Sequence, residues 1–92
     1  MALEYEKLKS NEELENGRIF MFSGKVTEII MQGEKNIFLI DVGTSEDAPQ
    51  IVYVEYYGSK SLQKDQKIKV FANRWGNNDG IPRMIAKYIY NK

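Results

Sequence analysis

The spacing of the apolar residues changes once along the chain, near Arg18. Before this point, residues 3–15 place apolar side chains among charges at intervals that favour a short helix or two helical turns over a strand. Asn11, with two glutamates after it, suits the cap of a second short turn, and Asn16-Gly17 ends that turn. Beyond Arg18 the apolar positions alternate with polar ones, and β-branched and aromatic residues dominate, which predicts strands.

The longest predicted strand contains a pair of small residues, Ser23-Gly24, in its middle. Phe20, Phe22 and Val26 share its apolar face, but the alternation slips after Val26. A slip beside a glycine is typical of a β-bulge or a sharp bend, because glycine lets the backbone turn where a side chain would clash. We therefore expect this strand to serve two sheets and to turn from one to the other at Ser23-Gly24.

Four further strands follow, separated by residues that favour turns. Their predicted ranges are 37–42, 50–57, 67–75 and 81–90. The connections between strands are a polar turn at 32–36, a flexible stretch at 43–49, a loop or short helical turn at 58–66 and a turn at 76–80. Five strands with a long, glycine-bent first strand predict an all-β, five-stranded Greek-key barrel, with a small sandwich or an SH3-like barrel as alternatives.

The composition limits the chemistry that the chain can perform. Its 92 residues suit one domain, and it has no Cys and no His. These absences remove the usual ligands of structural zinc, all thiol nucleophiles and the commonest general base, and no serine stands in a recognisable catalytic pattern. We therefore expect a protein that is not an enzyme and holds no cofactor and no metal. No dedicated calcium loop is formed by the acidic residues Asp41, Glu46, Asp47 and Asp79.

The charges are distributed unevenly, although they sum to zero. Residues 1–47 hold five Lys and Arg against ten Asp and Glu, a balance of −5, and residues 48–92 hold eight against three, a balance of +5. A net basic surface is typical of non-specific nucleic-acid binders, because much of their affinity comes from neutralising phosphates. The second half therefore carries either a local basic patch or ordinary solvated lysines on strand faces.

Several motifs occur in one order along nearly the whole chain. They are YEKLKSN at 5–11, Gly17, FSGKV at 22–26, IVYVEY at 51–56, LQKDQKIKVFANRWG at 62–76 and IPRMIAKYI at 81–89. Together they resemble the OB-fold family called tRNA-anticodon-binding-like, in the version found in predicted surface lipoproteins of low-GC Gram-positive bacteria. The resemblance implies an OB barrel over residues 18–92, with an N-terminal helical segment, residues 1–17, packed on it. It also implies a binding role and brings no catalytic residue with it.

The chain departs from this family in two places. It shows no N-terminal lipobox Cys or signal peptide, and Lys64-Asp65-Gln66 stands where a Gly-Asp or Asp-Asp pair is usual, although Asp65 can still cap the turn. An extracytoplasmic lipoprotein domain is the expected location if a signal peptide was removed, and the cytoplasm is expected otherwise. No apolar run approaches the roughly 20 residues that span a bilayer, so we expect no membrane insertion by this segment.

Candidate ligand contacts follow from where OB barrels hold their ligands, across the second and third strands and between the loops joining strands one to two and four to five. Outward aromatic side chains there can stack on bases or sugar rings, and cations can pair with phosphates or carboxylates. The candidates are Phe38, Tyr53, Tyr57, Phe71, Trp75, Lys25, Lys69, Arg74 and Arg83. Trp75, beside Arg74 and the Asn-rich turn, is the first choice, whereas packing in the core is the alternative for Phe38 and Phe71.

Two functions fit these observations. The first is a non-catalytic binding module of the cell envelope, whose ligand is a protein, a glycan or another polymer; the neutral net charge and the resemblance favour it. The second is a cytosolic single-stranded nucleic-acid-binding protein that uses outward aromatics and the basic second half of the chain. It requires one groove with outward aromatics to be lined by Lys25, Lys69, Arg74 and Arg83. For a closed barrel we expect a monomer.

Overall fold

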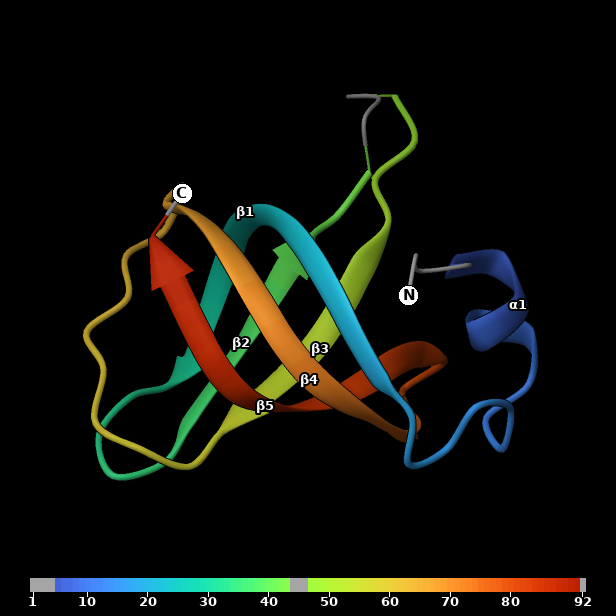
Figure 1. Ribbon diagram of the computed structural model, residues 1–92. Coiled ribbons are helices and arrows are strands. Elements are labelled where there is room, and N and C mark those ends of the chain that lie inside the picture. Colours follow the sequence, from blue (N-terminus) through green and yellow to red (C-terminus); the bar gives the residue numbers. More distant parts are fainter. Residues whose placement is uncertain (1–4, 44–46, 92) are drawn as a thin grey trace.

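A computed structural model describes residues 5–43 and 47–91 of the chain. Over these residues, five strands close into a barrel in the order β1-β2-β3-β5-β4 (Figure 1). The elements are α1 (Tyr5–Ser10), β1 (Ile19–Met31), β2 (Asn36–Asp41), β3 (Ile51–Tyr56), β4 (Lys67–Asn78) and β5 (Ile81–Asn91). The predicted all-β, five-stranded OB-like barrel with a short N-terminal helix is confirmed. Leu3 of the predicted helical segment, Glu46 of the acidic set and part of the predicted flexible stretch lie outside the described residues.

β1 serves both sides of the barrel, as its small central pair predicts. Its first half pairs with β4 from Ile19 to Lys25, and its second half pairs with β2 from Lys25 to Met31. A Cβ atom added to Gly24 would lie 2.2 Å from the backbone oxygen of Asp41, so only glycine allows β1 to approach β2 this closely. The predicted slip in alternation is a register shift between Val26 and Glu28.

The core of the barrel is formed by alternate residues of every strand. In β4, for example, Ile68, Val70 and Ala72 are fully buried, as the sequence predicts. A side chain that points inward is followed by one that points outward, because successive residues of a strand face opposite sides of the sheet. Large apolar members of the core include Phe20, Phe22, Phe38, Ile40, Ile68, Met84 and Ile89.

The N-terminal segment lies at one end of the barrel (Figure 1). Tyr5 and Leu8, one turn apart on α1, are both buried in the core, and Leu14 packs partly against it. The hydroxyl oxygen of Tyr5 accepts a hydrogen bond of 3.1 Å from the backbone N–H of Ile51. Burial raises the pKa of Tyr5, and the charges of Glu6 and Asp41 add to that rise. The six residues of α1 are therefore held by tertiary contacts, since an isolated helix this short is not stable in water.

The connection between β4 and β5 is shorter than predicted. The sequence predicts a turn over residues 76–80, but β4 continues to Asn78 and only Asp79-Gly80 form the turn. These two residues have φ angles of 50° and 80°, the left-handed conformation that a two-residue hairpin of type I′ requires. Gly76 also has a positive φ, of 65°, and lies within a register shift between Arg74 and Asn77. The glycine therefore marks a bulge inside the hairpin rather than the start of a loop.

The connection between β3 and β4 is a loop. Residues 58–66 contain no helix, so the second of the two predicted alternatives, the short helical turn, is wrong. Leu62 is its buried anchor, as its place among polar residues indicates. Asp65 has a φ of 72°, and its backbone N–H donates to the carbonyl oxygen of Val26 at 2.7 Å. The loop is thus tied to the bulged part of β1.

Candidate functional site

The nine candidate residues separate into three groups in the structure. Phe38 and Arg74 are buried. Tyr53, Tyr57, Trp75 and Arg83 lie on the outer surface that β3, β5 and the end of β4 share. Lys25, Phe71 and Lys69 lie on the outer surface of β1 and β4. One ligand site built from all nine is therefore excluded.

Phe38 belongs to the core and not to the surface. Its side chain is 1% exposed, and it points inward between Ile37 and Leu39, whose side chains point outward. The alternation of β2 is hard to read from sequence, because Ile37 is buried as well, although it faces outward. The prediction that Phe38 contacts a ligand is corrected by this burial, and the alternative of a packing role holds.

Arg74 is also corrected from a ligand contact to a structural residue. It points inward from β4, is completely buried, and donates only to backbone carbonyl oxygens. Its Nη2 atom donates to Leu8 at 2.8 Å and to Asn11 at 3.0 Å, and its Nε atom donates to Leu14 at 3.1 Å. Burial lowers the pKa of Arg74 below its ordinary value, and the nearby charge of Glu12 opposes this. The guanidinium therefore supplies hydrogen-bond donors to carbonyl groups at the C-terminal end of α1 and in the turns after it.

Neighbours of Arg74 on β4 hold the same segment. The side-chain amide of Asn73 donates to the carbonyl oxygen of Gly17 at 3.1 Å, and that of Asn77 donates to the carbonyl oxygen of Lys9 at 3.1 Å. The backbone N–H of Gly76 donates to the side chain of Asn16 at 2.8 Å. The Asn-rich turn, which the sequence places beside the first-choice ligand contact, thus holds the N-terminal segment on the barrel.

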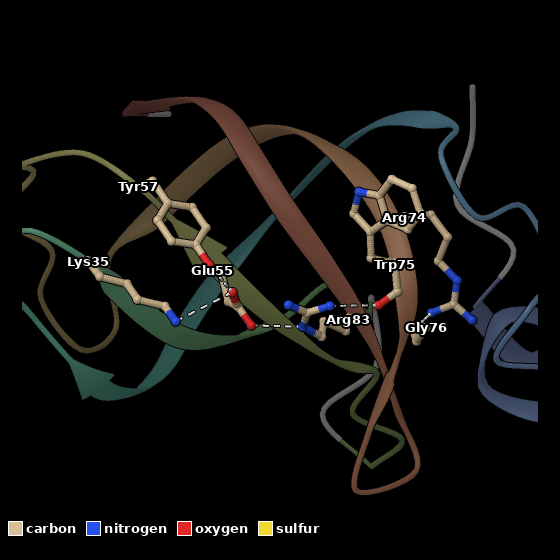
Figure 2. Close-up of polar contacts among 7 residues, drawn as sticks. All are labelled: Lys35, Glu55, Tyr57, Arg74, Trp75, Gly76 and Arg83. Atoms are coloured by element: carbon tan, nitrogen blue, oxygen red, sulfur yellow. Dashed lines mark hydrogen bonds and ion pairs between the residues drawn. The ribbon is translucent and has the colours of Figure 1, made fainter.

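Glu55 is the centre of a polar group on the outer surface of β3 (Figure 2). Its Oε1 atom accepts a hydrogen bond of 2.7 Å from Nε of Arg83, and its Oε2 atom accepts one of 2.8 Å from the hydroxyl of Tyr57. The ammonium of Lys35 lies 3.8 Å from Oε2 and 5.2 Å from the centre of the Tyr57 ring. Although the alternation of β3 turns Glu55 outward, these three partners leave it only 5% exposed.

The ion pair shifts the pKa of both partners. Burial by itself would raise the pKa of Glu55, but hydrogen bonds from Arg83 and Tyr57 and the charges of Arg83 and Lys35 outweigh it and lower the pKa below its ordinary value of 4.5. The hydrogen bond to Glu55 raises the pKa of Arg83 despite its burial. Both groups are therefore charged at neutral pH, and each holds the other in place.

Aromatic side chains border this polar group. Trp75 is 44% exposed and Tyr57 is 60% exposed, and the backbone oxygen of Trp75 accepts a hydrogen bond of 3.4 Å from Nη1 of Arg83. Tyr53 lies opposite Arg83 in the parallel pairing of β3 with β5. We call this surface the Glu55 row, formed by Lys35, Tyr53, Glu55, Tyr57, Trp75 and Arg83. It lies where the turn after β1, which holds Lys35, and the β4–β5 hairpin flank the barrel (Figure 2).

Several residues of the two outer surfaces are absent from the sequence-based candidates, and four of them bear on a ligand site. Glu55 and Lys35 belong to the Glu55 row, and Tyr88 and Tyr90 lie beside Phe71 on β5. A glutamate in the middle of a strand of apolar residues is a signal that can be read from sequence, because a charge there needs a partner. The two tyrosines are harder to place, because a register shift between Phe71 and Ala72 disturbs the alternation of β5 next to them.

The acidic residues do not gather into a metal site within the described ranges. Asp41 uses its Oδ1 atom to accept hydrogen bonds from the backbone N–H groups of Gly43 and Gln50, at 2.9 Å and 3.0 Å. Over residues 5–43 and 47–91, no three acidic side chains come close enough together to hold a cation. In the same ranges, no helix reaches the length and apolar character needed to cross a membrane.

No model of a known protein family matches the chain, and a comparison with curated proteins also gives no match.

Proposed function

We propose that the chain is a non-catalytic binding module of the cell envelope and that the Glu55 row is its ligand surface. The observation that carries the proposal is the arrangement around Glu55, which fixes the side chains of Arg83 and Tyr57 in place. Arg83 also donates to the backbone oxygen of Trp75, whose side chain is exposed. Side chains that are ordered before binding lose less conformational entropy on binding, so a surface of this kind binds more strongly for its area. The cell-envelope location is supported by the sequence resemblance alone.

A protein segment is the ligand that the chemistry of the Glu55 row favours. Trp, Tyr and Arg dominate the energetically important residues of protein interfaces, and this surface presents all three. The carboxylate of Glu55 pairs with both Arg83 and Lys35 and offsets one of their two positive charges. Because phosphate binding depends on uncompensated positive charge, the Glu55 row is poorly suited to a nucleic acid.

The groove that the nucleic-acid hypothesis requires is not supported in its original form. Arg74 is buried and Arg83 is paired with Glu55, so neither joins Lys25 and Lys69 on one surface. Lys25 and Lys69 lie on a different face of the barrel, the outer surface of β1 and β4.

Selection from a random peptide library displayed on phage tests the proposal. We expect enriched peptides that bind the wild-type chain and that lose at least tenfold in affinity with Trp75→Ala or Arg83→Gln. Tyr88→Ala is the control, because Tyr88 is also an exposed aromatic and lies outside the Glu55 row. A library that yields no binder, or binders indifferent to both substitutions, would contradict the proposal. A glycan array probed with the same variants tests the other polymer class.

A further inference from the structure

A second aromatic surface lies on the outer face of β1, β4 and β5, which run side by side in Figure 1. Met21 of β1 lies opposite Phe71 of β4, and Phe71 lies opposite Tyr88 of β5. In the next row along the strands, Ser23 lies opposite Lys69, and Lys69 lies opposite Tyr90. We call this surface the lysine–aromatic face. Its outward residues are Ile19, Met21, Ser23 and Lys25 of β1, Lys67, Lys69, Phe71 and Asn73 of β4, and Ile85, Tyr88 and Tyr90 of β5, with exposed Lys87 at the bulge.

The aromatic rings of this face pack against one another while remaining open to solvent. Phe71 and Tyr90 meet edge to face, with 5.9 Å between ring centres, and Tyr88 and Tyr90 lie nearly parallel at 6.4 Å. Tyr88 is 59% exposed and Tyr90 is 51% exposed. Rings held in this way by a sheet can stack on bases, as the aromatic side chains of known RNA-binding sheets do.

The charge on this face is entirely positive. Lys25, Lys67, Lys69 and Lys87 are present, and the outward positions of the three strands at this face include no Asp or Glu. In the part of the chain that the structure describes, none of these lysines forms an ion pair. The acidic residue opposite Lys25 on β2 is Asp41, whose carboxylate is engaged by backbone N–H groups.

Two of these lysines oppose each other directly. Lys25 and Lys67 are cross-strand partners in the pairing of β1 with β4. Like charges in this position destabilise a sheet, and the one acidic cross-strand partner of the pair is Asp41, opposite Lys25 on β2. An anionic ligand that lies across β1 and β4 would relieve the repulsion.

We propose that the lysine–aromatic face binds single-stranded nucleic acid, with bases stacked on Tyr88, Tyr90 and Phe71 and phosphates beside the lysines. The inference does not rest on the proposed function, because it uses a different face of the barrel. A second copy of the chain is a poorer occupant, since a symmetric dimer through this face would place lysines against lysines. An uncharged partner would leave the charge of Lys25 and Lys67 unrelieved.

Fluorescence anisotropy with labelled mixed-sequence single-stranded DNA and RNA tests the proposal. If four lysines contact phosphates, affinity falls about 50-fold between 50 and 200 mM salt, because the logarithmic slope for single strands is about −0.7 per phosphate. Tyr88→Ala is expected to weaken binding about fivefold or more, as the loss of one stacked base does. The double variant Lys67→Gln/Lys69→Gln is expected to reduce both the affinity and the salt slope.

Control variants and a control ligand make the result decisive. Tyr57→Ala and Lys35→Gln alter an exposed tyrosine and a lysine of the Glu55 row, and they are expected to leave oligonucleotide binding unchanged. Absence of binding at 50 mM salt, or equal losses from the two sets of variants, would overturn the proposal. Equal affinity for an abasic oligonucleotide would overturn the proposed stacking, because the face would then bind the sugar–phosphate backbone and not the bases.

Sedimentation velocity tests whether a second copy of the chain occupies the lysine–aromatic face. A dimer of the chain that Tyr88→Ala dissociates would show that the face binds a second copy, and the proposal would be wrong. Phage selection tests peptide binding by the Glu55 row, and anisotropy tests oligonucleotide binding by the lysine–aromatic face. Failure of one proposal is therefore distinguishable from failure of the other.

Discussion

The guanidinium of Arg74, on β4, donates a hydrogen bond of 2.8 Å to the carbonyl oxygen of Leu8, on α1, and these residues are 66 positions apart in the sequence. Further bonds from the same side chain reach Asn11, Leu14 and Gly76. A charged group can be buried at low cost only when its donors are satisfied, and here the carbonyl oxygens at the end of α1 and in the following turns satisfy them. One buried side chain of the barrel therefore holds three carbonyl oxygens of the N-terminal segment.

Removal of this guanidinium should destabilise the whole protein. Arg74→Ala leaves four carbonyl oxygens without their donor and opens a cavity at the barrel end, and we expect a loss of about 3 kcal/mol in the free energy of unfolding. Urea denaturation measures the loss, with the outward-facing Lys69→Ala as the control. If Arg74→Ala were as stable as wild type but bound ligand less tightly, the structural role would be refuted.

Gly24→Ala tests the closure of the barrel at β1. The added Cβ would sit 2.2 Å from the backbone oxygen of Asp41, so β1 and β2 must separate or the barrel must distort. We expect a loss of about 3 kcal/mol or more in the free energy of unfolding. Ser23→Ala, at the neighbouring position, should change stability by less than about 1 kcal/mol. Similar melting curves for the two variants would show that the bend at this pair does not need glycine.

The ion pair of Glu55 should make stability depend on pH in the acid range. The pKa of Glu55 is lower in the folded protein than its ordinary value of 4.5, so the ionised group contributes stability above that value, and the contribution is lost as the pH falls through the folded pKa. We expect Glu55→Gln to be about 1 to 3 kcal/mol less stable than wild type at pH 7 and nearly equal to it at pH 3. Urea denaturation across this range is the measurement, with exposed Glu28→Gln as the control. A stability difference that grew on acidification would contradict the assigned pairing.

Phe38→Ala should act on stability and not directly on a ligand. Because the ring is buried among apolar side chains, its removal should lower the free energy of unfolding by about 3 to 5 kcal/mol. Tyr88→Ala removes an equally large aromatic group from the surface and should lower it by about 1 kcal/mol at most. Thermal denaturation of the two variants compares them. A stable Phe38→Ala protein would place the ring outside the core.

Local sequence patterns predicted much of the barrel. The alternation of Ile68, Val70 and Ala72 placed the inner face of β4, and the slip beside Gly24 predicted where β1 changes sheets. Both signals are local, because side-chain direction in a strand follows from residue order and a missing Cβ allows close approach.

The sites depended on contacts between residues distant in sequence. Trp75 and Arg74 are adjacent in the chain, yet one is exposed and the other is buried against α1, and the burial follows from where the N-terminal segment docks. Likewise, Glu55 meets Arg83 only because β3 and β5 pair in parallel. Such pairings are decided by how the strands close into a barrel. The sequence by itself therefore determined the strands, the bend and the inner faces, whereas tertiary structure decided which charges are paired, buried or open to a ligand.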